Sequence, residues 1–417
     1  MIGYAPAVLL LLACTSSSIR VGAGDDTAAP GHDSPVPTFD TAEALGAAPQ
    51  DTAPDTDTDT DTDEERLYIP GVILEMSLDF DDNATRTLRW GSTEWVEGTL
   101  TFDGDSWLVG VRLKGSSTAD DLDGKPSLKI DADRYVADQK VRGHTKFNLH
   151  NQMIDPMMMS ETLTYESYRD AGMPAPRTAY VRLTINGDEY GLYNAVEPPS
   201  REFLRTWFGD DAGNLYENGW QDCEVTDPSC FDVEQDDESN DDALVALSQA
   251  ARLSGKEWDA AIFELLDEDA FVGAMTMEML LAHWDGYAYD LSNYRLYHHP
   301  TEQRFYFLPW STDLDYGWRP WSYPTCGRYG VEPSDYDDGI LALRCEQSET
   351  CHAAIVDRME VENERWAAAD PVARMEALYT LIRDDVYADR RKYYSNSDFE
   401  RDRKSTRLNS SHSSVSR

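Results

Sequence analysis

Acids and amides suited to phosphoryl transfer are concentrated in residues 281–317 of this sequence. Asp285 follows an apolar run, Asn293 opens the run YRLY, and Asp313 and Asp315 come shortly after the run FYFLPW. Phosphoryl transfer depends on positioning and charge neutralisation, so the attacking hydroxyl needs a nearby carboxylate and Mg²⁺ needs hard oxygen ligands. These four side chains supply both kinds of group.

The elements that must position these residues follow from the local pattern. The apolar spacing predicts a helix that ends just before Asp285, and the two aromatic runs predict two strands joined by a turn. Protein kinases carry a loop Asp near the attacking hydroxyl, a metal-binding Asn before a hairpin and a metal-binding Asp after it. The order of Asp285, Asn293 and Asp313 agrees with that arrangement.

Two alternatives remain for this region. Acids are common in the chain, 78 among 417 residues, so the pair Asp313 and Asp315 can arise by chance. Asp290 competes with Asp285 for the role beside the hydroxyl, because the loop before Asn293 is longer than in protein kinases. We favour Asp285 because it lies at the end of a predicted helix, which is a more rigid mount than the middle of a loop.

The composition is that of a globular protein with an acidic surface. Hydrophobic residues make up 41% of the chain, with 11 Trp and 22 Tyr, which is enough for a sizeable core. The formal net charge of −42 argues against nucleic acid and anionic membrane surfaces as partners and favours a basic, Ser-rich protein partner. An acidic surface that only keeps an exported protein soluble explains the charge equally well.

Both ends of the chain differ from its middle. Residues 1–14 contain a short apolar run that ends in Leu-Leu-Ala-Cys, which resembles a bacterial lipoprotein signal with Cys14 as the lipidated residue; an ordinary signal peptide is the alternative. Residues 15–66 are rich in Asp, Thr and Pro and predict an unfolded linker. Residues 403–417 turn basic and Ser-rich, resemble translated sequencing-adapter sequence, and are not expected to belong to the fold.

Cysteine placement favours disulfides over a metal site. Cys223 and Cys230 form one close pair in polar sequence, and Cys345 and Cys351 form another, as expected in an oxidising compartment. Cys326 is then left over. No Cys or His spacing matches a zinc site, and the connectivity stays open at this point.

The rest of the folded region predicts sheets first and helices later. Residues 68–113 alternate in short runs and predict a small antiparallel sheet, and a helix is expected from about Asp155 to Gly172. The dipeptide Asn186-Gly187 between two apolar runs predicts a hairpin. Residues 222–242 predict an acidic surface loop, and the chain after it is expected to be mainly helical.

Several motifs together resemble the spore-coat protein H (CotH) kinase family over roughly residues 67–390. They are RLKGSS, KPSLKI, ETLTYESYRDAG, INGDEYGLYNAVE, HWDGY, NYRLY and FLPWSTDLD, in the family's order. The resemblance implies an α+β, atypical protein-kinase-like two-lobed fold spanning 67–402. A β-rich N-lobe with one main helix would occupy about 67–200, and a mainly helical C-lobe about 201–402.

The resemblance also implies ATP and Mg²⁺, or Mn²⁺, as cofactors and assigns the reaction centre. Asp285 would orient the acceptor hydroxyl, while Asn293 and Asp313 would hold the metal with Asp315 as support or second ligand. The sequence departs from the family at Ser160, where Arg is usual, and in the length of the loop before Asn293.

A second set of residues is assigned to the nucleotide. Lys129, or Lys125 beside it, would bind the phosphates, and Glu161 on the following helix would clamp that lysine. Arg112 would contact phosphate beside the turn that follows it, and Glu197 would lie at the hinge near adenine. The alternatives are solvated strand-edge lysines, a plain turn, and an exposed hinge carboxylate without function.

These features predict an exported, lipid-anchored enzyme of the cell envelope, at the outer membrane or cell surface, that transfers the γ-phosphoryl group of ATP to Ser or Thr hydroxyls of a protein. The membrane would be contacted only through the lipid anchor. The first alternative is a non-catalytic surface lipoprotein that keeps the fold as a binding module. The second is a nucleotidyl transferase on the same fold.

Overall fold

Seven strands from the first half of the chain close into a barrel in the computed structural model, which describes residues 67–412 except 117, 219–222, 236–241 and 317–337. They are β1 (Ile73–Asp79), β2 (Val96–Phe102), β3 (Asp105–Lys114), β4 (Ser127–Asp131), β5 (Lys146–His150), β6 (Thr178–Ile185) and β7 (Asp188–Val196). Their order is β1-β2-β3-β4-β5-β7-β6, and β1 closes the barrel by pairing parallel to β6. The expected small antiparallel sheet is therefore part of a larger closed one.

The barrel interior is an apolar core built by alternation along the strands. Leu113, Leu128 and Leu149 are paired across β3, β4 and β5 and are buried, so their sequence neighbours point outward. The short helix α1 (Asp82–Arg89), which the sequence did not predict, begins at Asp81, whose side chain accepts from the backbone N–H of Ala84 at 2.7 Å.

The hairpin between β6 and β7 confirms the prediction from Asn186-Gly187. Ile185 is paired with Asp188, so only two residues form the turn. Asn186 and Gly187 both have positive φ, 50° and 83°, which is the conformation that such a two-residue turn requires.

The helix α2 (Ser160–Asp170) confirms the predicted helix but begins later. Its start is fixed by the buried Asp155, whose carboxylate accepts from the backbone N–H of Ser160 at 2.7 Å and from its hydroxyl at 3.0 Å. Leu163, Tyr165 and Tyr168 of α2 belong to the apolar core of the second half of the chain.

A second, four-stranded sheet of order β11-β10-β8-β9 lies in that half. Its strands are β8 (Asn214–Asn218), β9 (Phe231–Gln235), β10 (Tyr294–His298) and β11 (Phe305–Pro309). The predicted acidic loop at 222–242 is wrong in part, because β9 and the short helix η2 (Pro228–Cys230) lie within it. The hairpin of β10 and β11 confirms the prediction for the two aromatic runs.

Helices make up most of the remaining described chain, as expected. They are α3 (Arg201–Phe208), α4 (Asp242–Ala251), α5 (Lys256–Ala261), η3 (Ile262–Glu264), α6 (Glu268–Leu281), α7 (Tyr287–Asp290), η4 (Thr312–Leu314), α8 (Ile340–Gln347), α9 (Glu349–Ala368), α10 (Pro371–Ala388) and α11 (Asn396–His412). Helix α11 continues past residue 403, and Arg403 itself pairs with Glu376 at 2.8 Å. None of the helices in the described ranges is long and apolar enough to cross a bilayer.

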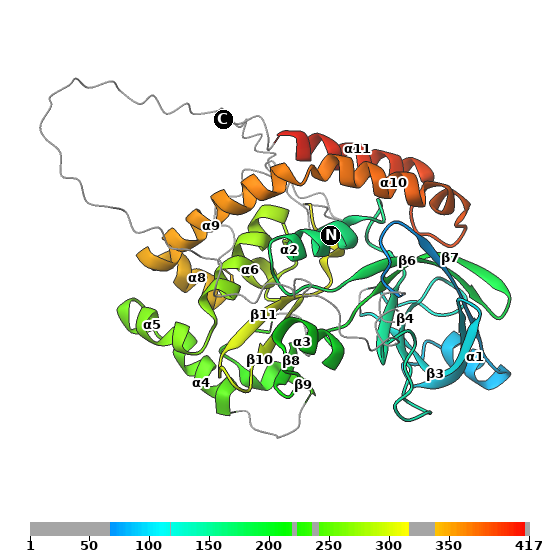
Figure 1. The fold of residues 1–417 in the computed structure, drawn as a ribbon, viewed down its shortest axis with the longest axis horizontal. Coiled ribbons are helices and arrows are strands. Elements are labelled where there is room, and N and C mark those ends of the chain that lie inside the picture. The colour runs from blue at the N-terminus through cyan, green and yellow to red at the C-terminus, as the bar shows by residue number, and fades with distance from the viewer. Residues whose placement is uncertain (1–66, 117, 219–222, 236–241, 317–337, 413–417) are drawn as a thin grey trace, which may run out of the picture. The chain divides into compact units, whose positions relative to one another are not determined.

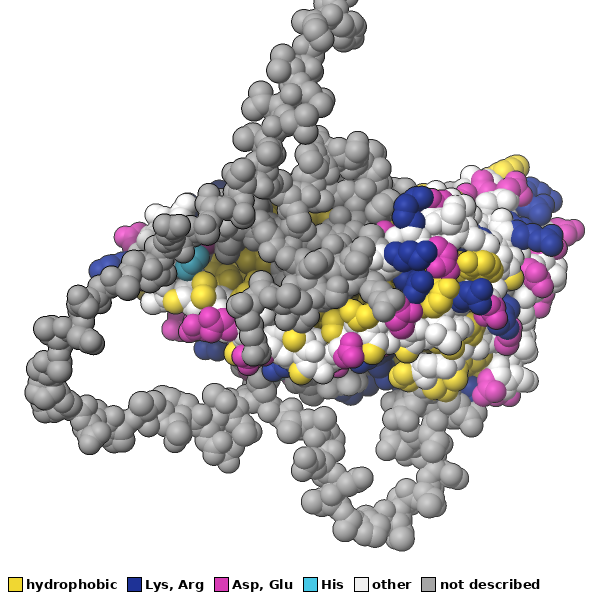
Figure 2. All heavy atoms as spheres, turned by 90° about the horizontal axis from the view of Figure 1, so that it is seen from above, with side chains coloured by type: hydrophobic (Ala, Val, Ile, Leu, Met, Phe, Trp, Pro, Cys, Tyr) yellow, Lys and Arg dark blue, Asp and Glu magenta, His cyan; other side chains and the backbone are white. Residues whose placement is uncertain are grey.

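Figure 1 shows the barrel beside the second sheet, with α9, α10 and α11 following one another along one side. Figure 2, seen from above, shows Lys and Arg side chains interspersed with Asp and Glu over the described part of that face. The described part of that face therefore carries no single continuous acidic patch. Interspersed charges of both signs are the pattern of a solvated surface.

Candidate active site

The outer face of the barrel presents a chain of three polar side chains to helix α2. The carboxylate of Glu161 is buried and lies 2.9 Å from Nδ1 of His150, while Nε2 of His150 lies 2.9 Å from Nζ of Lys114. Asn194, paired with His150 across β5 and β7, donates to Glu161 at 3.0 Å. The register of β3, β5 and β7 therefore brings Lys114, His150 and Asn194 to one place, and α2 adds Glu161.

The electrostatics of this chain match its contacts. Burial lowers the pKa of both Lys114 and His150, since each loses water; the positive charge of Arg295 lowers the pKa of Lys114 further, and the positive charge of Lys114 lowers that of His150. Burial alone would raise the pKa of Glu161, but His150, Asn194 and Lys114 lower it. Glu161 is therefore held ionised by the barrel.

The predicted pairing of Glu161 with Lys125 or Lys129 is wrong. The side chain of Lys125 is fully buried elsewhere, with Nζ 2.7 Å from the Asp389 carboxylate and 2.7 Å from the carbonyl of Leu192. Lys129 instead lies 3.6 Å from Glu234.

The lysine that approaches Glu161 is Lys114, which the sequence reasoning did not select. The signal was present in the motif RLKGSS, because Arg112 and Lys114 are two apart on a strand and so share one face. That face is the one turned toward α2.

Arg112 and Lys129 lie next to each other on this outer face, since they are paired across β3 and β4. The guanidinium of Arg112 stacks on Trp95 at 5.0 Å, and its buried Nε has no hydrogen-bond partner among the described residues. Both residues thus remain near the site, as predicted, although neither reaches Glu161.

A further cation that the sequence reasoning missed is Arg295 on β10. Its guanidinium is buried between Glu217 and Glu234 and stacks on Trp310 at 4.5 Å. Lys114 approaches the same indole at 5.6 Å. Trp310 therefore separates two cations that come from the barrel and from the second sheet.

Glu197 is not the exposed hinge carboxylate that the sequence suggested as an alternative to an adenine contact. It is buried and receives two hydrogen bonds from the guanidinium of Arg177, at 2.7 and 2.9 Å. This bidentate geometry is typical of a strong structural pair.

The predicted reaction centre is brought together by the loop after α6. Nδ2 of Asn293 donates to the carbonyl of Asp285 at 2.8 Å and to its carboxylate. Burial raises the pKa of Asp285 to about 7, His283 and Asn293 oppose the rise, and a hydrogen bond with Asp290 adds to it. The two acids that competed for one role therefore lie in contact.

Asp313 connects this loop to the barrel electrostatically. Burial raises the pKa of its carboxyl well above the usual value, and repulsion from Glu161 and then from Asp285 raises it further. Its carboxylate accepts from the hydroxyl of Ser311 at 3.3 Å. Asp313 thus faces acids from both α2 and the loop.

Asp315 has a different environment. It is fully buried, with one carboxylate oxygen bonded to Nδ1 of His283 and the other accepting from the hydroxyl of Thr164 at 2.7 Å. Burial opposes the positive charge of His283, but Asp315 more than compensates and the pKa of His283 rises to about 9. These contacts disfavour Asp315 as a metal ligand, and that role stays a prediction. The two hydrogen bonds of Asp315 connect α2 to the loop after α6.

Backbone strain is concentrated in the same region. Ala282, Leu291, Asn293 and Ser311 all have φ between 49° and 54°, which is costly for residues other than Gly. A Cβ added at Gly286 would lie 2.4 Å from Cδ2 of His283, so only glycine fits in the motif HWDGY.

Both predicted disulfides are confirmed, Cys223 with Cys230 and Cys345 with Cys351. Cys326 lies outside the described residues.

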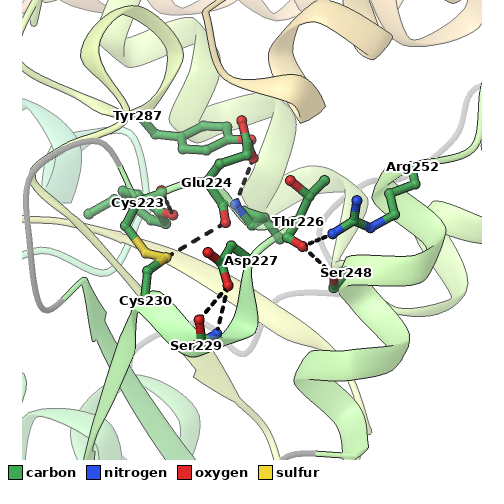
Figure 3. The surroundings of a disulfide bond; sticks show 11 residues. Cys223, Glu224, Thr226, Asp227, Ser229, Cys230, Ser248, Arg252 and Tyr287 are labelled. Atoms are coloured by element: carbon green, nitrogen blue, oxygen red, sulfur yellow. Dashed lines mark hydrogen bonds between the residues drawn. A yellow bond between two sulfur atoms is a disulfide. The ribbon is translucent and has the colours of Figure 1, made fainter.

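The first disulfide supports the reaction loop (Figure 3). The carboxylate of Glu224, next to Cys223, accepts from the hydroxyl of Tyr287 at 3.1 Å and from the backbone N–H of Ile340 at 2.8 Å. The hydroxyl of Tyr294 donates to the carbonyl of Cys223 at 2.7 Å. The disulfide loop therefore holds residues on both sides of Asn293.

The acids and the amide of this site fit a divalent cation better than they fit each other. Burial raises the pKa of Asp285 and Asp313, and Glu161 and Asp285 both repel Asp313 in the same buried region. A bound cation would relieve that repulsion. In the described part of the chain no group of three or more His, Cys, Asp or Glu side chains is arranged to hold a metal.

Comparison with known proteins agrees with the motifs. A model of the family described as CotH kinase protein matches residues 111–411, which include every predicted site residue. Invasin CotH2 of Rhizopus delemar is 26% identical over 274 residues, 60% of this chain and 45% of the relative. Invasin CotH3 of the same fungus is 23% identical over 273 residues, 60% of this chain and 44% of the relative. The chain thus spans less than half the length of these curated relatives.

Proposed function

Because the chain belongs to the CotH kinase protein family, we propose that it is an ATP-dependent protein kinase that transfers the γ-phosphoryl group to Ser or Thr hydroxyls. The observation that carries the proposal is the position of Asp313. It faces Glu161 and Lys114 of the barrel side and Asp285 of the reaction loop. Phosphoryl transfer needs a cation for the phosphates, an acid that binds the metal and a carboxylate near the attacking hydroxyl within one site.

The two halves of the structure are assigned to two lobes on the same basis. The barrel with α2 corresponds to the N-lobe of a kinase-like fold, and the second sheet with the later helices corresponds to the C-lobe. Lys114, supported by Arg112 and Lys129, contacts the nucleotide phosphates from the N-lobe. Asn293 and Asp313 hold Mg²⁺ or Mn²⁺ from the C-lobe, and the metal, when bound, neutralises charge on the phosphates.

Asp285 acts on the acceptor hydroxyl. A carboxyl group whose pKa is near 7 can accept a proton at neutral pH, which suits a group that positions and deprotonates a hydroxyl. Asn293 fixes the orientation of that carboxylate by donating to it and to the carbonyl of the same residue. Asp290, in contact with Asp285, raises the pKa of the Asp285 carboxyl and does not itself position the acceptor hydroxyl.

We also propose that the protein works outside the cytosol, at the cell envelope, anchored through Cys14. The two disulfides support an oxidising compartment. The acidic net charge supports a basic, Ser-containing protein substrate. The rival function is a surface binding module without catalysis, and it is favoured by the name invasin that the curated relatives carry.

The test is transfer of label from ATP by the purified chain. With γ-labelled ATP we expect label on a protein acceptor, and with α-labelled ATP we expect none; the reverse would favour nucleotidyl transfer. Asp285→Asn should keep ATP binding and lower the rate by a factor on the order of 10²–10⁴, the range for losing a positioned acid–base group.

A matched control removes an acid from the surface instead. The side chain of Asp384 is 93% exposed, so Asp384→Asn should leave the rate unchanged. A nearly normal rate in Asp285→Asn together with an inactive Asp290→Asn would show that the roles of the two acids are exchanged. A wild-type chain that binds ATP and moves neither label would support the binding module.

A further inference from the structure

His150 separates a lysine and a glutamate that protein kinases bring into direct contact. The imidazole is buried, with Nε2 2.9 Å from Nζ of Lys114 and Nδ1 2.9 and 3.0 Å from the two carboxylate oxygens of Glu161. Its ring edge faces Trp310 at 6.1 Å, in the run that leads to Asp313. Both ring nitrogens are therefore used by charged groups from two different elements, β3 and α2.

Hydrogen-bonding rules determine the proton arrangement in this chain of contacts. A lysine ammonium can only donate, so Nε2 of His150 must accept from it. The ring proton of a neutral imidazole then lies on Nδ1, which donates to the carboxylate of Glu161. Asn194 donates to the second oxygen of Glu161 at 3.0 Å and fixes the carboxylate. The arrangement uses both ring nitrogens of His150 and both carboxylate oxygens of Glu161.

We propose that His150 is a positioning residue for the phosphotransfer reaction, which couples Glu161 on α2 to Lys114 and holds the Lys114 ammonium toward Asp313. The proposal rests on the proposed function for the part that concerns the reaction. The groups that face Lys114 besides His150 are Glu161, Asp313, Arg295 and Glu217. Of these, Glu161 is the one that His150 connects to Lys114 by hydrogen-bond contacts at both ring nitrogens.

A purely packing role for His150 predicts a different outcome from a coupling role. The imidazole fills space between β5 and α2, and an amide side chain of similar size would fill much of it. If packing were all, the two amides Gln and Asn would behave alike and the state of Glu161 would not matter. A coupling role needs a donor and an acceptor at the same time.

Two substitutions separate the two hydrogen bonds. His150→Gln places an acceptor near the position of Nε2 but loses the donor to Glu161, and His150→Asn places a donor near Nδ1 but loses the acceptor for Lys114. Each should lower kcat/KM for ATP by about 10- to 100-fold, the effect of losing one hydrogen bond to a charged group. In a Glu161→Gln background, adding His150→Gln should cost less than about threefold, because the coupling is already broken.

Rescue and a control complete the kinetic test. Added imidazole should restore part of the lost rate in His150→Gly, which a general loss of packing would not show. His299 is also a buried histidine with ring contacts, to Phe208 and to the turn after it, but it lies outside the site. His299→Gln should change kcat/KM by less than about threefold if burial alone does not explain the effect.

A nucleotide-free measurement decides the coupling independently of activity. Ring ¹⁵N spectra of labelled protein, with His150 assigned by its absence in His150→Gln, should show a proton on Nδ1 and none on Nε2. Glu161→Gln should change the Nδ1 signal. A proton on Nε2, or wild-type kinetics in both amide variants, would overturn the proposal. A wild-type chain that moves no label would refute the proposed function, while the ¹⁵N result would still decide whether His150 couples Glu161 to Lys114.

Discussion

Replacing Lys125 by Met tests whether this lysine serves the fold or the nucleotide. Lys125 and Asp389 are fully buried, with Nζ 2.7 Å from the carboxylate, so Lys125→Met leaves an acid without its cation. Breaking a buried pair by removing one partner costs about 3–5 kcal/mol. Asp389 still accepts from the backbone N–H groups of Leu192, Arg391 and Lys392 at 3.1, 2.8 and 3.0 Å, so we expect a loss of about 3 kcal/mol, at the lower end.

Urea unfolding measures this loss from the midpoint and slope of the transition. The double variant Lys125→Met with Asp389→Asn should be more stable than Lys125→Met alone, because the remaining side chain is no longer charged. The matched control is Lys129→Met. The side chain of Lys129 is 20% exposed, and its Nζ lies 3.6 Å from Glu234, which is a looser ion pair than that of Lys125. It should lose less than about 1 kcal/mol. If Lys125→Met unfolds like the wild type but no longer responds to Mg-ATP, the structural reasoning is refuted and Lys125 is a nucleotide ligand.

Two further predictions concern the buried acids. Asp313→Ala should abolish the rise in melting temperature that Mg-ATP causes while the nucleotide-free protein stays folded, because it removes a ligand and a repelled carboxylate; an undiminished rise would contradict the metal role. Burial raises the pKa of Glu278 from 4.5 to about 7, so the folded chain binds more protons than the unfolded chain between these values and its stability falls as pH rises through that window. The loss from Glu278 should reach about 3 kcal/mol near neutral pH, and Glu278→Gln should remove this contribution to the pH dependence of the unfolding free energy. An unchanged slope in the variant would show that another group titrates.

Local signals in the sequence were sufficient for elements that depend on neighbouring residues. The hairpin at Asn186-Gly187 follows from the conformations those two residues tolerate, and the disulfide between Cys223 and Cys230 joins residues only seven apart. The grouping of Asp285 with Asn293 follows in the same way, since one loop carries both.

Features that depend on strand register could not be read from the sequence. Closure of the barrel pairs β1 with β6, more than a hundred residues apart. Which lysine faces Glu161 depends on how β3, β4 and β5 are aligned, and a shift of one residue would turn Lys114 away. Strand β9 was missed because its acids suggest a loop, whereas Glu234 is paired with Arg295 from β10, on the far side of β8 in the same sheet.

The pair of Lys125 and Asp389 also has a consequence for how the chain is made. The two residues are 264 positions apart, and a ribosome adds roughly 5–20 residues per second, so Asp389 follows Lys125 by roughly 13 to 50 seconds. During that interval an ammonium group that is fully buried in the finished domain has no carboxylate to pair with. The barrel comes first in the sequence, yet Lys125, which lies shortly before β4, waits for its partner until the residue just after α10 has been made. Newborn chains that stop short of residue 389 should therefore carry a barrel that is less stable and more sensitive to protease than the barrel of the finished domain.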